Sequence, residues 1–194
     1  MNIEIKKLTP ELLHAWLYYI ENAAYEKNDE WRWCFCMHFH WCPKLIERDK
    51  KEQLTYSSRY YAIEYIIKGK LQGYVAMQDD KVVGWCNAND KQAYGCDVWL
   101  DESDAGRKIK SIVCFNIAPA MRRQGIASML LKKVCDDAKA ENYDYVEVYP
   151  FNCPDGESRD YHGPFGMYEK QGFVVHKKLE HTSVCRKYFT TAIP

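Results

Sequence analysis

A short turn near the middle of the chain has the residue types and spacing that bind an anion. Before it, Ile112–Ile117 is a run of apolar and β-branched residues that predicts a buried strand, and Pro119 ends any strand pairing. After it, apolar residues at helical spacing predict an amphipathic helix that continues to about Ala138. The turn itself, Arg122–Ala127, carries two arginines and a glycine.

The chemistry of this turn follows from its place at the start of a helix. The first turn of a helix has N–H groups without intrahelical partners and a partial positive charge, so it attracts phosphate groups. Gly125 lets a bulky ligand approach the backbone, and Arg122 and Arg123 add charge. These residues predict a phosphate site, and the alternative is an ordinary surface turn with two solvated arginines.

A second stretch, Trp31–Cys42, is rich in aromatic rings and soft metal ligands. Its thiols and imidazoles belong to Cys34, Cys36, His38, His40 and Cys42. As a strand the stretch would spread these ligands over about 27 Å, and as a helix it would point Cys36 and His40 away from the others. Neither form gathers four ligands, and the Cys-x-x-Cys pairs typical of zinc sites are absent from it. We therefore predict no metal site.

Two further interpretations of Trp31–Cys42 need no metal. One is core packing, because free cysteines and aromatic rings are commonly buried. The other is a reactive thiol at Cys34 or Cys36, for which Arg32 and the histidines are the basic residues close in sequence.

The N-terminal part of the chain predicts a strand and two helices. Ile3–Lys7 alternates weakly and predicts an edge strand. Thr9, followed by proline and glutamate, starts a helix whose apolar residues recur at helical spacing. A second helix is expected from about Glu52 to Lys68, and Gly69 suits its end.

A hairpin and a loop should follow these helices. Gly73–Gln78 and Lys81–Asn87 predict two strands joined by the turn-forming pair Asp79 and Asp80. Gln92–Lys110 is polar and acidic, which indicates a loop before the central strand.

The C-terminal part predicts a strand, a short helix and a final pair of strands. Tyr145–Tyr149 alternates as a strand does, and Asn152–Gly163 is a polar loop. Phe165–Gln171 predicts the helix, and Phe173–Leu179 and Val184–Phe189 predict the strands. The order of elements predicts one α/β domain, residues 1–194, with a mixed central sheet flanked by helices.

Four motifs in this order resemble the GNAT N-acetyltransferase superfamily. The turn matches the family's acyl-CoA signature, Q/R-x-x-G-x-G/A, through Arg122, Gly125 and Ala127. Other segments resemble the family's second and third strands, its fifth strand with a following asparagine, and its Y-E-K-x-G-F phrase: Asp80–Trp85, Val146–Asn152 and Met167–Phe173. More narrowly, three segments resemble a bacterial branch with a Cys-x-Cys segment near its N-terminus: Trp33–Met37, Val83–Cys86 and Val113–Phe115.

The resemblance implies acetyl-CoA as the cofactor and places its contacts. Backbone amides of the turn should hold the CoA pyrophosphate, which gives the cofactor-binding residues Arg122, Arg123, Gln124, Gly125, Ile126, Ala127 and Ser128. Amides near the end of the central strand, at Phe115, Asn116 and Ile117, should stabilise the charge that develops on the thioester oxygen. The resemblance also places Trp31–Cys42 over the acceptor amine, as an aromatic wall.

The resemblance also suggests catalytic residues. Tyr168 is the candidate acid that protonates the departing CoA sulfur, and the alternative is a core tyrosine with a satisfied hydroxyl. Glu147, a carboxylate in an otherwise apolar strand, is the candidate base, on a face that is either exposed or buried. His162, Asp97 or a chain of waters are alternatives to Glu147.

Asn152 departs from the family pattern. In the family the asparagine lies a few residues before the tyrosine, whereas here Cys153–Met167 separates Asn152 from Tyr168. Either this insertion carries substrate contacts and Asn152 still binds the cofactor, or Asn152 is not equivalent to the family's residue.

Charge and composition limit the kinds of partner and the compartment that we expect. The formal net charge of zero gives no reason to expect nucleic acid or an anionic membrane as partner. No apolar run is long enough to span a membrane and the N-terminus lacks a signal-peptide core, so we expect a cytoplasmic protein. The nine cysteines should then be mostly free, buried thiols, and a homodimer is left open.

The sequence therefore predicts an acetyl-CoA-dependent N-acetyltransferase in which the primary amine of a small molecule or peptide attacks the thioester directly. One alternative is a CoA-fold module that senses metal or oxidation through Cys34–His40. Another is an acyltransferase with a longer acyl donor or a non-amine acceptor. The acceptor itself stays open, because the aromatic residues of Trp31–Cys42 favour an apolar or aromatic amine, whereas acids in Asp97–Asp104 suit a cationic one.

Overall fold

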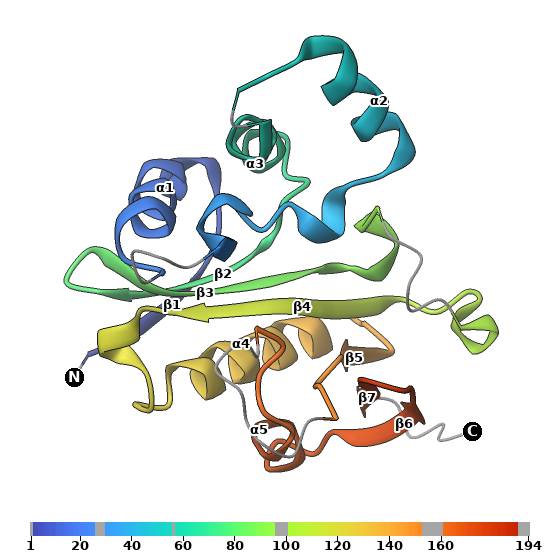
Figure 1. Ribbon diagram of the computed structural model, residues 1–194. Helices are drawn as coiled ribbons and strands as arrows, with labels where there is room; N and C mark the ends of the chain where they lie inside the picture. The colour runs from blue at the N-terminus through green and yellow to red at the C-terminus, as the bar shows by residue number, and fades with distance from the viewer. Residues whose placement is uncertain (1, 26–29, 56, 96–100, 153–160, 190–194) are drawn as a thin grey trace.

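A seven-stranded sheet forms the centre of the molecule, as the computed structural model in Figure 1 shows. The structure describes residues 2–25, 30–55, 57–95, 101–152 and 161–189. The strand order is β1-β2-β3-β4-β5-β7-β6. The strands are β1 Glu4–Lys7, β2 Gly73–Gln78, β3 Lys81–Asp90, β4 Ile109–Ile117, β5 Tyr145–Val148, β6 Val174–Lys178 and β7 Ser183–Tyr188. β4 and β5 run parallel, and the other neighbouring pairs run antiparallel.

Helices cover both faces of the sheet. On one face lie α1 Leu13–Asn22, α2 Pro43–Glu52 and α3 Ser57–Ile67, and on the other α4 Ile126–Ala140 and α5 Phe165–Glu169 (Figure 1). Short 3₁₀ helices are Pro10–Leu12, Glu30–Trp33, His38–His40, Lys91–Ala93, Glu102–Asp104 and Pro119–Met121. No helix in the described ranges is both long and apolar enough to cross a bilayer.

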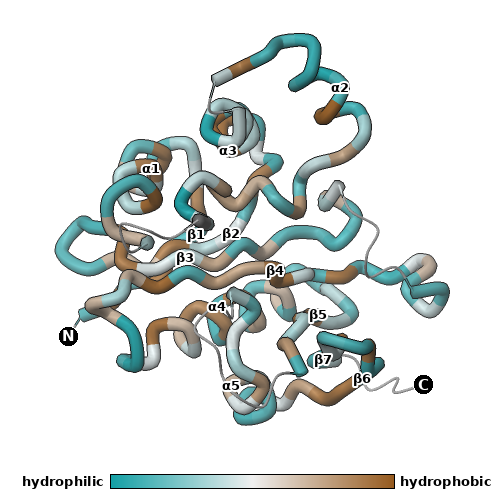
Figure 2. Tube along the Cα trace, in the orientation of Figure 1, coloured by the Kyte–Doolittle hydropathy of each residue, from teal (hydrophilic) through white to brown (hydrophobic). Residues whose placement is uncertain are grey.

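Each face of the sheet has its own apolar core. Trp16 of α1 and Trp85 of β3 meet edge to face, with ring centroids 5.7 Å apart, at the centre of one core. In the other, Leu130 of α4 packs among residues that include Val146 and Val148 of β5. Figure 2 shows the corresponding apolar stretches along the central strands. Burying a side chain the size of Leu130 stabilises the fold by about 1.5–3 kcal/mol. The two apolar cores therefore hold the sheet between the two layers of helices.

The parallel pair at the centre of the sheet is short, and this positions the site. β5 pairs with β4 only along Ile109–Ile112. β4 continues to Ile117 while it stays paired with β3. The edge of β4 from Val113 to Ile117 therefore has no β5 partner and leaves backbone groups for other contacts.

The predicted fold is confirmed, with one helix wrong. The hairpin turns at Asp79 and Asp80, whose φ values of 47° and 60° suit the mirror-image turns that join twisted strands. The helix predicted over Glu52–Lys68 is instead two helices, because α2 ends at Glu52 and α3 begins at Ser57. α2 escaped prediction because Leu45 is its one buried residue, so it shows little apolar periodicity.

Candidate active site

The predicted phosphate turn opens α4 and is free to take a ligand. Gly125 lies immediately before the helix with a φ of 80°, a conformation that glycine adopts without strain. A Cβ built on Gly125 meets no atom within 4 Å, so the space beside it is open. Among the described residues, none accepts a hydrogen bond from the first-turn amides of Ile126, Ala127 or Ser128. These amides can therefore donate to an anion.

Two side chains of the turn fold back and fix its shape. Arg122 Nε donates to the Ile117 carbonyl at 3.2 Å, and Gln124 Nε2 donates to the Ala120 carbonyl at 3.1 Å. Both side chains are exposed, and the remaining Arg122 donors stay available to a ligand. The turn is thus attached directly to the free edge of β4.

The free edge of β4 differs from the prediction at Phe115. We expected its amide to be open, but it donates to the Tyr161 carbonyl at 2.6 Å. Successive amides of a strand alternate in direction, so the Ile117 N–H points to the same side, where no described residue accepts from it. The Asn116 N–H points toward β3 instead, as does that of Ala118, which donates to Val83. The structure therefore corrects the expected set: Ile117 has an open amide, Phe115 an occupied one, and Asn116 faces away.

Asn116 has a different use from the one expected. The Tyr19 hydroxyl donates to its side-chain oxygen at 2.6 Å and lies 2.9 Å from its carbonyl oxygen. Both residues are buried. This pair attaches α1 to the end of β4 and supports the edge that the ligand would reach.

Tyr168 lies beside the edge of β4. It belongs to α5, is fully buried, and its ring centroid is 6.5 Å from that of Phe115. Its hydroxyl donates to the His162 carbonyl. The structure therefore brings the candidate acid and one candidate amide together, although they are far apart in the sequence.

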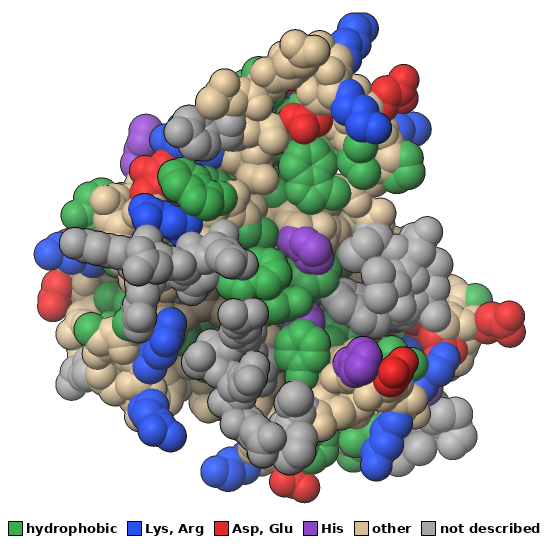
Figure 3. Space-filling model, viewed as in Figure 1, with side chains coloured by type: hydrophobic (Ala, Val, Ile, Leu, Met, Phe, Trp, Pro, Cys, Tyr) green, Lys and Arg blue, Asp and Glu red, His purple; other side chains and the backbone are tan. Residues whose placement is uncertain are grey.

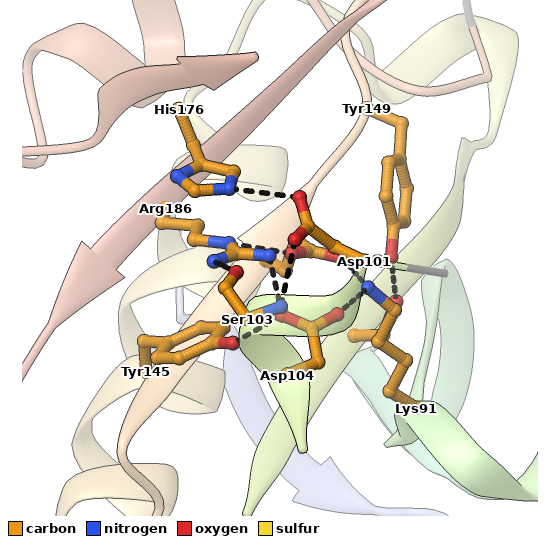
Figure 4. A network of polar contacts seen from close by, with 10 residues as sticks. Lys91, Asp101, Ser103, Asp104, Tyr145, Tyr149, His176 and Arg186 are labelled. Carbon is orange, nitrogen blue, oxygen red and sulfur yellow. Dashed lines mark hydrogen bonds and ion pairs between the residues drawn. The ribbon is translucent and has the colours of Figure 1, made fainter. Parts of the chain in front are cut away.

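Glu147 is the centre of a buried ionic cluster. Figure 4 shows its partners Lys91, Tyr149 and Arg186. It is fully buried on β5, so the exposed-face interpretation is wrong. Its Oε1 is 2.6 Å from Lys91 Nζ and accepts from the Tyr149 hydroxyl at 2.7 Å, and its Oε2 is 2.7 Å from Arg186 Nε. Both oxygens are engaged by cations, which favours a structural role over proton transfer. The base assignment of Glu147 stays a prediction.

Asp104 completes this ionic cluster. It pairs with Lys91 at 2.6 Å and with Arg186 at 2.6 Å, and it accepts from the Tyr145 hydroxyl at 2.6 Å. The cluster thus attaches the segment between β3 and β4 to β5 and β7. Its members come from four distant segments, so no local sequence pattern could have revealed it.

Asn152 is committed to the hairpin of β6 and β7. Its side chain donates to the Leu179 carbonyl at 2.8 Å and accepts from the Ser183 hydroxyl at 2.6 Å, and its N–H donates to the His181 carbonyl at 2.9 Å. No described contact joins it to the α4 turn. Its predicted role in cofactor binding is therefore untested, and these contacts supply a structural reason for the asparagine.

Aromatic side chains from two segments meet over the free edge of β4. The Tyr161 ring centroid lies 5.4 Å from that of Trp31, 6.3 Å from Phe39 and 5.8 Å from Phe151. Figure 3 shows hydrophobic and histidine side chains gathered at the centre of this face. Tyr161 carried no sequence signal, because it lies in a polar insertion.

His162, an alternative base, is buried in this aromatic group. Its ring is 4.9 Å from that of Phe151, and burial lowers its pKa to about 3, with a backbone contact to Val113 opposing the shift. Its imidazole is therefore neutral at physiological pH but weakly basic. Asp97, the other alternative, lies outside the described residues.

The middle of the Trp31–Cys42 stretch packs as core, since Phe35–His40 is buried apart from His38, whereas Trp31 and Trp33 are exposed. Within the described ranges, no three His, Cys, Asp or Glu side chains converge as a metal ion would need. Burial raises the pKa of Cys34 to about 11, and Cys36 accepts a hydrogen bond from Trp85 Nε1 at 3.1 Å. Because the thiolate is the reactive form, these contacts do not favour a reactive or redox-sensing thiol.

The remaining described thiols are small side chains that lie mostly in the interior. The described cysteines outside this stretch are free, and most of them are buried. They act as small apolar side chains. Cys96 and Cys153 lie outside the described residues.

The fold and site define an α/β domain that presents a glycine-capped helix start next to a strand edge that β5 leaves without a strand partner, an arrangement suited to a phosphate-bearing ligand. The chain matches the model of the Acetyltransferase (GNAT) family over residues 28–173, and it belongs to that family. The predicted family and enzyme class are thereby confirmed, whereas the branch with the Cys-x-Cys segment stays a prediction.

Solved structures show the same fold over nearly the whole chain. The PaiA N-acetyltransferase of Thermoplasma acidophilum, solved in complex with coenzyme A, aligns over 97% of this chain and 99% of its own, with 16% identity and a TM-score of 0.57. An N-acetyltransferase from Staphylococcus aureus Mu50 aligns over 98% and 100%, with 15% identity and a TM-score of 0.58. A GNAT-family acetyltransferase from Streptococcus pneumoniae aligns over 97% and 100%, with 13% identity and a TM-score of 0.56. No curated protein sequence matches the chain.

Proposed function

We propose that this acetyltransferase moves an acetyl group from acetyl-CoA to a primary amine, which attacks the thioester directly. The observation that carries the proposal is the open first turn of α4 beside the free edge of β4. A CoA ligand has a diphosphate for the turn and an amide-bearing arm that can pair with a strand edge. Both features fit what the chain leaves unsatisfied.

The turn would hold the diphosphate. The residues in reach are the ones predicted from the sequence: Arg122, Arg123, Gln124, Gly125, Ile126, Ala127 and Ser128. Their amides and guanidinium groups donate charge-assisted hydrogen bonds, and the open space at Gly125 admits the ligand against the backbone. The chain thus fits the cofactor without rearrangement of the turn.

The edge of β4 and Tyr168 would carry out the chemistry. Bound acetyl-CoA supplies an activated carbonyl. One amide of this edge, that of Ile117 or that of Phe115 once Tyr161 has left it, polarises the carbonyl by donating to its oxygen, where negative charge develops. As the amine nitrogen bonds to the carbonyl carbon, the C–S bond breaks and the Tyr168 hydroxyl gives its proton to the departing sulfur. The proton that the amine loses passes through water and restores the Tyr168 hydroxyl.

The acceptor would approach from the aromatic side of the edge. Trp31 and Phe151 are 39% and 36% exposed there and present flat apolar surfaces beside Tyr161. Such surfaces favour an amine that carries an apolar or aromatic group. Glu147 takes no direct part in this proposal, because its oxygens hold Lys91 and Arg186.

The test combines binding with turnover. We expect calorimetry to show stoichiometric binding of CoA and acetyl-CoA, and a panel of amines to release CoA in a thiol assay. Mass spectrometry of the product should show an added acetyl group, and comparison with longer acyl-CoA donors tests the alternative donor. A protein that gives no heat with CoA and no competition between CoA and acetyl-CoA contradicts the proposal.

A further inference from the structure

The edge of β4 that β5 leaves free is occupied by a segment of the chain itself. Tyr161–Gly163, here called the edge segment, precedes α5. The Tyr161 carbonyl accepts from the Phe115 amide at 2.6 Å, and the His162 side chain contacts the Val113 backbone. The edge segment therefore pairs with β4 in the place where an additional strand would lie.

The same segment also holds the candidate acid. The Tyr168 hydroxyl donates to the His162 carbonyl. Gly163 has a φ of 78°, and a Cβ built on it would lie 2.9 Å from Met167 Cε and 3.1 Å from the Tyr168 hydroxyl. Glycine is needed here because both the backbone conformation and the close approach to Tyr168 exclude a side chain.

Part of the contact that holds the edge segment is open to solvent. The Tyr161 ring packs on Trp31 and Phe151, and both of these side chains are partly exposed. An acyl-CoA that gains contacts at the α4 turn as well as at β4 can displace a segment held in this way.

We propose that the edge segment is a built-in competitor of acyl-CoA: it occupies the Phe115 amide and the Tyr168 hydroxyl together, and binding of the thioester arm releases both. This inference rests on the proposed function, because it assumes that the thioester uses the edge of β4. Release of one short segment then makes both groups available in a single step. The apparent affinity for CoA equals the affinity of the open form multiplied by the fraction of molecules in which the edge segment is released.

Two variants loosen the segment in different ways. Gly163→Ala forces a methyl group against Tyr168, and Tyr161→Ala removes the ring that packs on Trp31 and Phe151. The matched control is Gly106→Ala, because Gly106 has a similar φ of 74° but no atom within 4 Å of a built Cβ. It imposes the same backbone strain without the clash.

Amide exchange on the full chain reports whether the edge segment protects the Phe115 amide. Calorimetry on the full chain reports whether the edge segment competes with CoA. Exchange of the Phe115 amide, followed by NMR with ¹⁵N-phenylalanine, should accelerate about tenfold in both loosened variants, and CoA should bind about tenfold tighter. Gly106→Ala should change neither quantity.

The outcomes separate this inference from the proposed function. Measurable CoA binding that is unchanged or weaker in both variants, with faster Phe115 exchange, overturns the competitor and leaves the proposed function standing. Phe115 exchange that stays slow in both variants shows that the segment does not protect this amide and also overturns it. Absence of CoA binding in the wild-type protein and in all variants overturns both.

Discussion

Tyr168 is the residue whose chemistry depends most directly on its neighbours. We predict that Tyr168→Phe lowers kcat about 10²-fold, because the departing sulfur loses its proton donor, while the affinity for CoA does not fall and rises by up to about tenfold as the edge segment loses this hydrogen bond. Loss of the hydrogen bond to His162 should cost about 1 kcal/mol in the free energy of unfolding. Steady-state CoA release and calorimetry measure the two effects, and a kcat equal to that of the wild type would exclude the acid role.

Substitution of Glu147 tests whether its carboxylate is structural or catalytic. Glu147→Gln removes one of the two carboxylates shared by Lys91 and Arg186 and leaves one buried positive charge uncompensated, so we predict a loss of about 3–5 kcal/mol in the free energy of unfolding. The control is Asp136→Asn, which breaks an exposed pair with Lys132 and should leave the free energy of unfolding nearly unchanged. Urea denaturation measures both. A Glu147→Gln protein of normal stability and abolished turnover would instead support the base assignment.

At the residue scale, the sequence predicted which residues matter better than it predicted the side chains and backbone groups that they contact. Glu147 stood out as a carboxylate in an apolar strand, but whether its face is covered depends on Lys91, Asp104 and Arg186, which come from distant segments. Phe115 was correctly placed on the central strand. Its amide partner, Tyr161, could not be predicted, because nothing in a polar insertion indicates where its carbonyl groups point.

Among the elements, the start of α4 is the one on which cofactor binding depends. We predict that Gly125→Trp lowers CoA affinity about 100-fold or more, because the indole fills the open space at the turn and at least two charge-assisted hydrogen bonds are lost. Calorimetry gives the affinity. Gly69→Trp is the control, since Gly69 also has a positive φ, 65°, and open space, but lies after α3. Equal CoA affinity in the two variants would contradict the assignment of the turn.

Elements with a strong local signal were predictable and the others were not. The β2–β3 hairpin and α4 have clear turn residues or apolar periodicity, and both appear where expected. α2 has neither, although Pro43 at its first position and the pair of Arg48 with Glu52 one turn apart are helix signals in hindsight. The strand patterns alone do not show where the pairing of β4 with β5 stops, and the structure shows that it ends at Ile112.

For the whole molecule, buried histidines predict sensitivity to acid. Burial lowers the pKa of His40 to about 4 and that of His162 to about 3. Above pH 6.5 both residues are neutral in the folded and unfolded states and contribute nothing to pH dependence. Between pH 6.5 and about 4 the unfolded chain binds protons that the folded chain does not, so the free energy of unfolding falls as pH falls.

The free energy of unfolding should fall by about 1.4 kcal/mol per pH unit for each histidine well below pH 6.5. This loss is complete below about pH 3. Urea denaturation at several pH values measures it. His40→Gln should reduce the slope between pH 6 and 4 by the share of one histidine, whatever its effect at pH 7. A slope as steep as that of the wild type would show that His40 is not the responsible group.

At the largest scale, the overall fold followed from the order of elements, whereas the placement of charges did not. A net charge of zero gave no hint that Lys91, Asp104, Glu147 and Arg186 gather in one buried cluster. Composition counts charges, and only the three-dimensional structure shows which of them share a site.

The position of Arg186 in that cluster bears on how the protein is made. Arg186 lies on β7, after Glu147 in the chain, and it neutralises a carboxylate on an inner strand of the sheet. During translation Glu147 leaves the ribosome before Arg186 does, and until then its burial is penalised. β5 can therefore be buried with its charge fully paired only after β7 has been synthesised.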